Sequence, residues 1–121
     1  MLEATVEAME ALGAERGRIA AGVGPTIAQR SYEVGPEFPA PMLGQSADNG
    51  DFFCPARREG HFLFDLKGYV ARRLSSMGLK GVQCLPCDTC GEPDRFFSYR
   101  RSRQLGEADY GRGLSAIYLE T

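Results

Sequence analysis

Apolar residues recur at helical spacing in two segments of the chain. The first covers residues 1–12 and ends before Gly13, and the second covers residues 66–77 and follows Asp65, a residue type that caps helix N-termini. The apolar stripes are Leu2, Val6, Met9 and Leu12 in the first segment and Leu66, Tyr69, Val70, Leu74 and Met77 in the second. Charged side chains occupy the opposite faces, so the pattern predicts two amphipathic helices.

Short apolar runs bounded by glycine or polar residues predict strands. Residues 18–23 and 82–85 are two such runs. Residues 114–119 are a third, and their apolar character predicts a strand that is buried on both faces. Residues 61–64 form a further apolar cluster that leads into the second helix.

Glycine, proline and polar residues fill the segments between these elements. Residues 26–34 are expected to form one or two helical turns, and the proline-rich residues 36–60 short helical turns or an ordered loop. Residues 86–93 are expected to be turns, and residues 102–112 a polar loop. Helices thus alternate with few strands, which predicts a mixed α/β (α+β) fold with helices flanking a mixed sheet.

Composition sets limits on size and partners. A length of 121 residues supports one domain at most, and 43% hydrophobic and 25% charged residues are ordinary for a globular protein. The formal net charge of −2 gives no electrostatic reason to expect a nucleic-acid partner, and no apolar run is long enough to span a membrane. The chain shows no leader of the secretory type, so we expect it in the cytoplasm.

Three cysteines form the sharpest local pattern, C-x2-C-x2-C, at Cys84, Cys87 and Cys90. Thiolates at this spacing hold a structural zinc ion when a tight turn brings them together. A closed zinc site needs four ligands, so Cys54 or His61 would have to be the fourth. The favoured alternative is three reduced cysteines, two of them in a turn, since disulfides are rare in the cytoplasm.

His61 is the only histidine of the chain. Catalytic zinc sites commonly use several histidines, so this chain by itself is not expected to build one. A nucleophilic pair of Cys54 and His61 is an alternative that sequence spacing does not establish. A half-buried structural histidine beside aromatic residues is the favoured interpretation.

Arginines cluster toward the C-terminus, and guanidinium groups suit phosphate or carboxylate partners. Acidic residues lie between them, so a surface of internal ion pairs is the favoured alternative. The arginines are Arg95, Arg100, Arg101, Arg103 and Arg112, and the acids are Glu92, Asp94, Glu107 and Asp109. Near the first strand, Gly22 and Gly24 lack the spacing of a nucleotide-binding loop.

Several stretches resemble motifs of one family. Residues 22–35 read GVGPTIAQRSYEVG, which is similar to the segment G-P-x-I-x-x-x-x-Y-E-V-G of the YfiH family. Residues 95–101 read RFFSYRR and residues 111–119 read GRGLSAIYL, which are similar to its closing F-F-S-Y-R-R and G-R-x-x-S-x-I pattern. Residues 61–74 and 2–14 resemble two of its helices. The motifs occur in the same order along essentially the whole chain, which makes the resemblance specific.

The resemblance implies a fold and an activity. Members of this family are described as laccase-domain or polyphenol oxidase proteins, and as purine nucleoside phosphorylases with adenosine deaminase activity. Their fold is a mixed α/β structure with a large sheet. Their metal, zinc or copper, is held by two histidines and one cysteine. The implied ligands of a complete protein are therefore a metal ion, a purine nucleoside and phosphate.

The family's metal ligands lie in H-G, A-D-C and H-A-G-W-R-G segments, and this sequence contains none of them. The chain thus resembles only the C-terminal half of a YfiH-type laccase domain, and residues 1–121 are expected to be that half or a single domain. We expect a truncated protein that is inactive alone and carries no cofactor or catalytic residue of its own. A missing N-terminal half or a second copy of the chain is its expected partner.

Some motif residues are candidates to contact a nucleoside, its phosphate or the missing half. They are Tyr32 in the first motif, Arg100 and Arg101 in the second, and Arg112 in the third. Arginine would hold the anion, and tyrosine would stack or donate a hydrogen bond. The alternative is that the first motif is a turn and the second docks the last strand.

Two further hypotheses belong to other functional classes. One is a small zinc-binding or protein-interaction module built on Cys84, Cys87 and Cys90. The other is a structural remnant whose exposed sheet edge is covered by self-association or by a partner chain.

Overall fold

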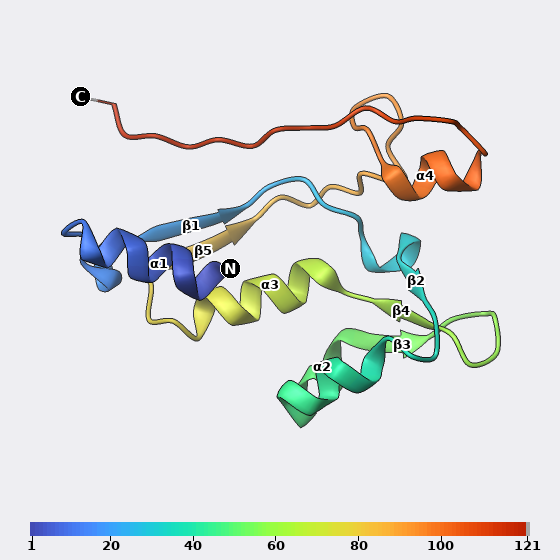
Figure 1. Cartoon of the computed structure of the whole chain (residues 1–121), viewed down its shortest axis with the longest axis horizontal. Helices are drawn as coiled ribbons and strands as arrows, with labels where there is room; N and C mark the ends of the chain where they lie inside the picture. The colour runs from blue at the N-terminus through green and yellow to red at the C-terminus, as the bar shows by residue number, and fades with distance from the viewer. Residues whose placement is uncertain (121) are drawn as a thin grey trace.

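The computed structural model describes residues 1–120 as a mixed α/β fold, which confirms the predicted class. Its parallel and antiparallel strand pairs form two small sheets rather than one (Figure 1). The elements are α1 (Leu2–Ala11), β1 (Ala20–Val23), β2 (Glu33–Val34), α2 (Pro39–Gln45), β3 (Phe53–Pro55), β4 (Phe62–Phe64), α3 (Leu66–Ser75), β5 (Gly81–Cys84) and α4 (Tyr99–Gln104), with short 3₁₀ turns at Arg16–Arg18, Gln29–Ser31 and Ala47–Phe52.

The first sheet pairs β1 and β5 in parallel, with Ala20 opposite Gly81 and Val23 opposite Cys84. Helices α1 and α3 cover one face of it (Figure 1). Their contact with the sheet forms the aliphatic core, which contains no aromatic side chain. Its buried members are Val6, Leu74 and Met77, joined by Leu2, Ile19, Ala21, Val23, Val70, Leu79 and Val82. Both strands were predicted from their apolar runs.

The second sheet is antiparallel, in the order β2-β4-β3. It packs with α2 and the start of α3 around the aromatic core, whose centre is Phe64 at 2% exposure. The stacked rings of Phe53 and Phe64 lie 4.9 Å apart between centroids. The other members are Val34, Phe52, Tyr32, Phe38, Met42, Phe62, Leu66 and Tyr69.

Helix α3 joins the two cores. It begins where the Asp65 carboxylate accepts a hydrogen bond from the backbone N–H of Gly68 at 2.9 Å, which confirms the predicted N-cap. Its first turn places Leu66 and Tyr69 in the aromatic core, whereas Val70 and Leu74 lie in the aliphatic core. One amphipathic stripe therefore serves both cores.

The predicted final strand at 114–119 is absent. These residues are extended but unpaired, and Leu114, Ile117 and Leu119 are 94%, 89% and 93% exposed. Residues 108–120 make no backbone–backbone hydrogen bond in the part of the chain that the structure describes. A strand needs a neighbour to satisfy its backbone groups, and here none lies alongside.

The loop predicted at 102–112 also needs correction, because α4 runs through Ser102 to Gln104. The Ser98 side chain caps this helix by accepting a hydrogen bond from the N–H of Arg101 at 3.2 Å. Ser98 therefore begins a helix rather than docking a strand.

Helix α1 confirms the first predicted helix, although its apolar stripe is only half covered. Val6 is buried, but Met9 is 39% exposed and Leu12, just beyond the helix end, is 90% exposed. Within residues 1–120 no helix has both the length and the apolar character that a membrane crossing demands.

Candidate functional site

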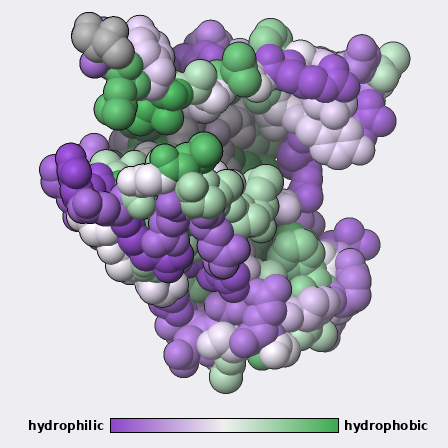
Figure 2. Space-filling model, turned by 60° about the vertical axis from the view of Figure 1, so that its left-hand side comes forward, coloured by the Kyte–Doolittle hydropathy of each residue, from purple (hydrophilic) through white to green (hydrophobic). Residues whose placement is uncertain are grey.

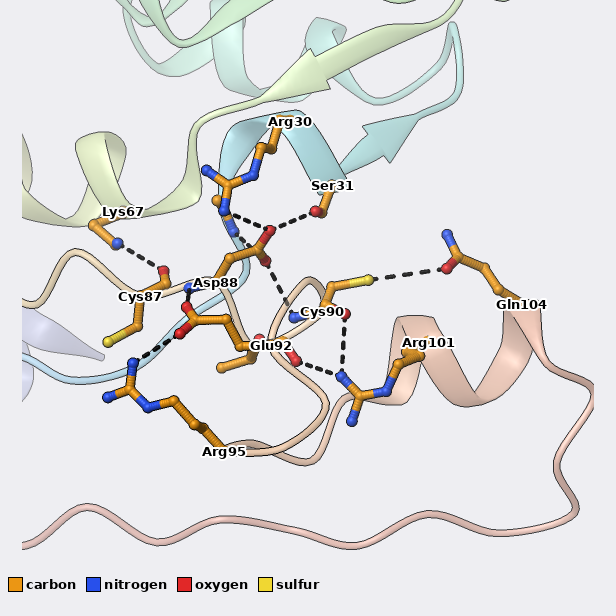
Figure 3. Close-up of polar contacts among 12 residues, drawn as sticks. Arg30, Ser31, Lys67, Cys87, Asp88, Cys90, Glu92, Arg95, Arg101 and Gln104 are labelled. Carbon is orange, nitrogen blue, oxygen red and sulfur yellow. Dashed lines mark hydrogen bonds and ion pairs between the residues drawn. The ribbon is translucent and has the colours of Figure 1, made fainter.

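The segment that follows β5 folds back onto the 3₁₀ turn at Gln29–Ser31, and Asp88 lies at the junction (Figure 3). Its carboxylate is 1% exposed and accepts three hydrogen bonds. Ser31 Oγ donates at 2.6 Å, and the backbone N–H groups of Ala28 and Cys90 each donate at 3.1 Å. Arg30 Nη2 completes the set at 3.3 Å. Asp88 thus joins two segments about sixty residues apart in the sequence.

Two opposing influences set the charge state of this carboxylate. Burial raises the pKa of Asp88, but the hydrogen bonds from Ser31, Ala28 and Cys90, with the nearby backbone N–H of Gly91, together outweigh it. The pKa therefore lies below its ordinary value, and Asp88 is ionised at neutral pH.

The backbone of the same loop is held from two sides. The N–H of Asp88 donates to Glu92 Oε2 at 2.7 Å, and Arg95 donates to the other oxygen of that carboxylate at 2.7 Å. The bond from the Asp88 N–H, with the nearby Arg95, lowers the pKa of Glu92. Lys67 on α3 donates to the carbonyl of Cys87 at 3.0 Å. Charged side chains of the loop itself and of α3 therefore hold the loop backbone in place.

Arg101, a predicted anion ligand, points into this loop instead. Its Nη1 donates to the carbonyl oxygens of Thr89 at 2.7 Å and Cys90 at 3.1 Å, and its Nη2 donates to that of Phe96 at 2.6 Å. A guanidinium that holds three carbonyl oxygens ties α4 to the loop. The geometry gives Arg101 a positioning role.

Tyr32 and Arg100 are brought together by the fold. The guanidinium of Arg100 lies 5.2 Å from the centre of the Tyr32 ring and donates to the carbonyl of Glu33 at 2.6 Å. The Tyr32 ring is half-buried against Phe38 and Phe64. Arg112 lies elsewhere, over the ring of Tyr110 in the extended segment after α4. Of the four residues predicted to contact a ligand, the fold therefore brings only Tyr32 and Arg100 together.

The cysteines are not gathered. Cys84 is exposed at the end of β5, Cys87 is buried, and the side chains of Cys87 and Cys90 point away from each other (Figure 3). His61 Nδ1 lies 3.1 Å from the carbonyl oxygen of Glu59, in its own loop. Within residues 1–120, no three His, Cys, Asp or Glu side chains are close enough to share a metal ion. These side chains do not fit a zinc or copper site, neither the catalytic one that the resemblance implies nor the Cys84/Cys87/Cys90 alternative.

The family model described as multi-copper polyphenol oxidoreductase laccase matches residues 1–120, almost the whole chain. The chain belongs to this laccase family. The resemblance found in the sequence motifs is thereby confirmed.

Several curated relatives of this laccase-family chain are named purine nucleoside phosphorylases. That of Rickettsia conorii (RC0672) is 37% identical over 98 residues, which are 81% of this chain and 41% of the relative. That of Pseudomonas aeruginosa (PA4543) is 32% identical over 120 residues, which are 99% of this chain and 46% of the relative. The chain thus spans less than half the length of these relatives.

One solved structure shares the fold of this laccase-family chain. The Neisseria meningitidis protein NMB0706 matches with a TM-score of 0.69 and 28% identity, over 80% of this chain and 40% of that protein. The match again covers a minor part of the longer protein.

Replacing Arg101 by lysine should lower the free energy of unfolding by about 2 kcal/mol, because an ammonium group cannot hold three carbonyls in the fork geometry of a guanidinium. Arg18→Lys is the control, since the Arg18 side chain is 80% exposed and its ion pair with Glu15 is long, at 3.9 Å. Urea unfolding of both variants measures the difference. Equal midpoints would contradict the positioning role of Arg101.

Asp88 was missed as a site residue by sequence reasoning. Its position between Cys87 and Cys90 identified only a turn. The sequence did contain the donors that a buried, ionised carboxylate needs. They lie in the first motif, at Ala28, Arg30 and Ser31. Nothing in a single sequence links the two segments.

Proposed function

We propose that this chain is the C-terminal portion of a purine nucleoside phosphorylase, which transfers the ribosyl group of a purine nucleoside to phosphate and releases the purine base. The observation that carries the proposal is the match to relatives of that name over 81–99% of this chain but only 41–46% of their length. The zinc or copper ion implied by the family, and the adenosine deaminase activity of some members, belong in this proposal to residues outside this chain.

In such an enzyme, this chain would bind the substrates and hold the binding side chains in position. Arg100 is the candidate to hold an anion, since its guanidinium is half-buried, lies over the Tyr32 ring and donates only one hydrogen bond within residues 1–120. Tyr32 is the candidate to contact the base or the ribose. Arg101 would keep α4, and with it Arg100, in place.

Cytoplasmic residence completes the proposal. In that reducing compartment the four cysteines would remain thiols.

The purified chain is expected to release no hypoxanthine from inosine and phosphate, because it lacks the family's metal ligands. A chimera, in which this chain replaces the matching 46% of the Pseudomonas aeruginosa relative, is expected to do so. Chromatography of the purine base and of ribose 1-phosphate measures both proteins. Turnover by the chain alone, or none by a folded chimera, would contradict the proposal.

Arg100→Ala in the same chimera tests whether Arg100 holds the phosphate. We expect it to raise KM for phosphate about tenfold, as the loss of one charge-assisted hydrogen bond predicts. Its matched control is Arg103→Ala, on the same helix but with an exposed side chain.

A further inference from the structure

A hollow separates β1 from the extended C-terminal tail, defined here as residues 107–120. It consists of two adjoining cavities of about 600 and 520 Å³ that share Met9, Ile19, Ala20 and Ile117 in their walls. Figure 2 shows green, apolar residues gathered around a hollow in the molecule. Since both cavities have β1 on one side and the tail on the other, the hollow runs along the strand.

One edge of β1 faces this hollow. The carbonyls of Ile19 and Val23 accept hydrogen bonds from the β5 side, from Lys80 at 2.8 Å and Leu85 at 3.1 Å. In a strand of a parallel sheet, the N–H and C=O of one residue point to the same edge, and those of the next residue point to the other edge. The N–H and C=O groups of Ala20 and Gly22 therefore point away from β5, to an edge that no strand of residues 1–120 covers.

The tail forms the opposite wall. It passes β1 in an extended conformation (Figure 1) and touches the chain beyond the strand end, where an added Cβ at Gly24 would lie 2.8 Å from Ser115 Oγ. From there Ser115, Ala116 and Ile117 line the hollow with unpaired backbone. Two unpaired extended backbones thus face each other across an apolar gap.

We propose that this hollow takes one extended apolar β-strand, which pairs with Ala20 and Gly22 on one side and with residues 115–119 of the tail on the other. The strand belongs to the sequence that the relatives possess and this chain does not contain, so the inference rests on the proposed function. Parallel sheets are found buried and with several strands, and a two-stranded one has little stability alone. More than half of each relative lies outside the match and is available to supply the strand.

A second copy of the chain is a poorer occupant. The unpaired extended segments that it offers within residues 1–120 are its tail and the outer edge of β1, and in each copy both already form walls of the hollow. A strand from the remaining sequence pairs both walls at once.

Hydrogen exchange of the backbone amides tests the proposal. In the chain alone, the amides of Ala20 and Gly22 should exchange about tenfold or more faster than those of Ala21 and Val23, which face β5. In the chimera with the Pseudomonas aeruginosa relative, all four should be protected to a similar degree. Fast exchange at Ala20 and Gly22 in a folded chimera would overturn the proposal.

Measurements on the chain alone also test the proposal, even if the chimera does not fold. Sedimentation should give the mass of one chain, with Ala20 and Gly22 unprotected. A dimer with both amides protected would overturn the proposal in favour of a second copy. A monomer with both protected would overturn it in favour of the chain's own tail closing onto β1.

Proline substitutions provide a matched pair of variants. Ala20→Pro removes an N–H that faces the hollow, so it should leave the melting temperature of the chain unchanged and lower that of the chimera. Ala21→Pro removes an N–H that faces β5 and should destabilise both proteins. Equal melting temperatures of the chimera with and without Ala20→Pro would overturn the proposal.

The two proposals fail in different ways. A chimera with protected Ala20 and Gly22 but no release of purine base would refute the proposed function and leave the strand site standing. A chimera that releases purine base while these amides exchange freely would refute the strand site alone.

Discussion

Replacing Asp88 by alanine is expected to lower the free energy of unfolding by about 3–5 kcal/mol. The substitution leaves Ser31 Oγ and the N–H groups of Ala28 and Cys90 without an acceptor in a half-buried place, and it removes the partner of Arg30. Total stabilities of small domains are of a similar size, so the variant should be largely unfolded near physiological temperature. Thermal unfolding followed by far-UV circular dichroism measures it.

Asp51→Ala is the control for this experiment. The Asp51 side chain is 69% exposed and forms a surface ion pair with Arg72 at 3.1 Å, an arrangement worth less than about 1 kcal/mol. A loss of equal size in both variants would show that Asp88 does not join the two segments.

The same carboxylate makes stability depend on pH. Because the folded pKa of Asp88 lies below its ordinary value of 3.8, ionised Asp88 stabilises the fold above that pH. The contribution is lost as the pH falls through the folded pKa. The difference in unfolding free energy between the wild type and Asp88→Asn should therefore be constant from about pH 5 to 7 and shrink below about pH 4. A difference that grows on acidification would contradict this sign.

Replacing Phe64 by alanine should also cost about 3–5 kcal/mol, because it empties the centre of the aromatic core. The ring is 2% exposed and packs against Tyr32, Phe38, Phe53 and Tyr69. Phe97→Ala is the matched control, since the Phe97 side chain is 63% exposed. Chemical unfolding compares the two, and a small effect of Phe64→Ala would mean that the second sheet contributes little to stability.

Elements with a local cause were predictable from the sequence. Helix α3 has a periodic stripe and an Asp65 cap, and both operate within a few residues. The strands β1 and β5 are apolar runs of their own. The short strands β2 and β3 were missed, because two or three residues carry no readable period and the pairing with β4 alone defines them.

The prediction of a final strand at residues 114–119 was wrong for a related reason. Residues 114–119 have the composition of a buried strand, but a strand exists only where a neighbour accepts its hydrogen bonds. The arginines show the same limit at the site. Arg101 was predicted as a candidate to hold an anion, and only the fold shows that its guanidinium donates to three backbone carbonyls of the loop.

The separation of the two cores determines what spectroscopy can see. The chain contains no tryptophan, and every aromatic side chain that packs into either core lies in the aromatic one. Tyrosine fluorescence and near-UV circular dichroism therefore report on the aromatic core and on surface rings. They do not detect the packing of α1 on β1 and β5. An experiment that relies on these signals alone would record a single transition even if the aliphatic side had melted earlier. Helical signal in the far ultraviolet is the probe that must coincide with them before unfolding is treated as two-state.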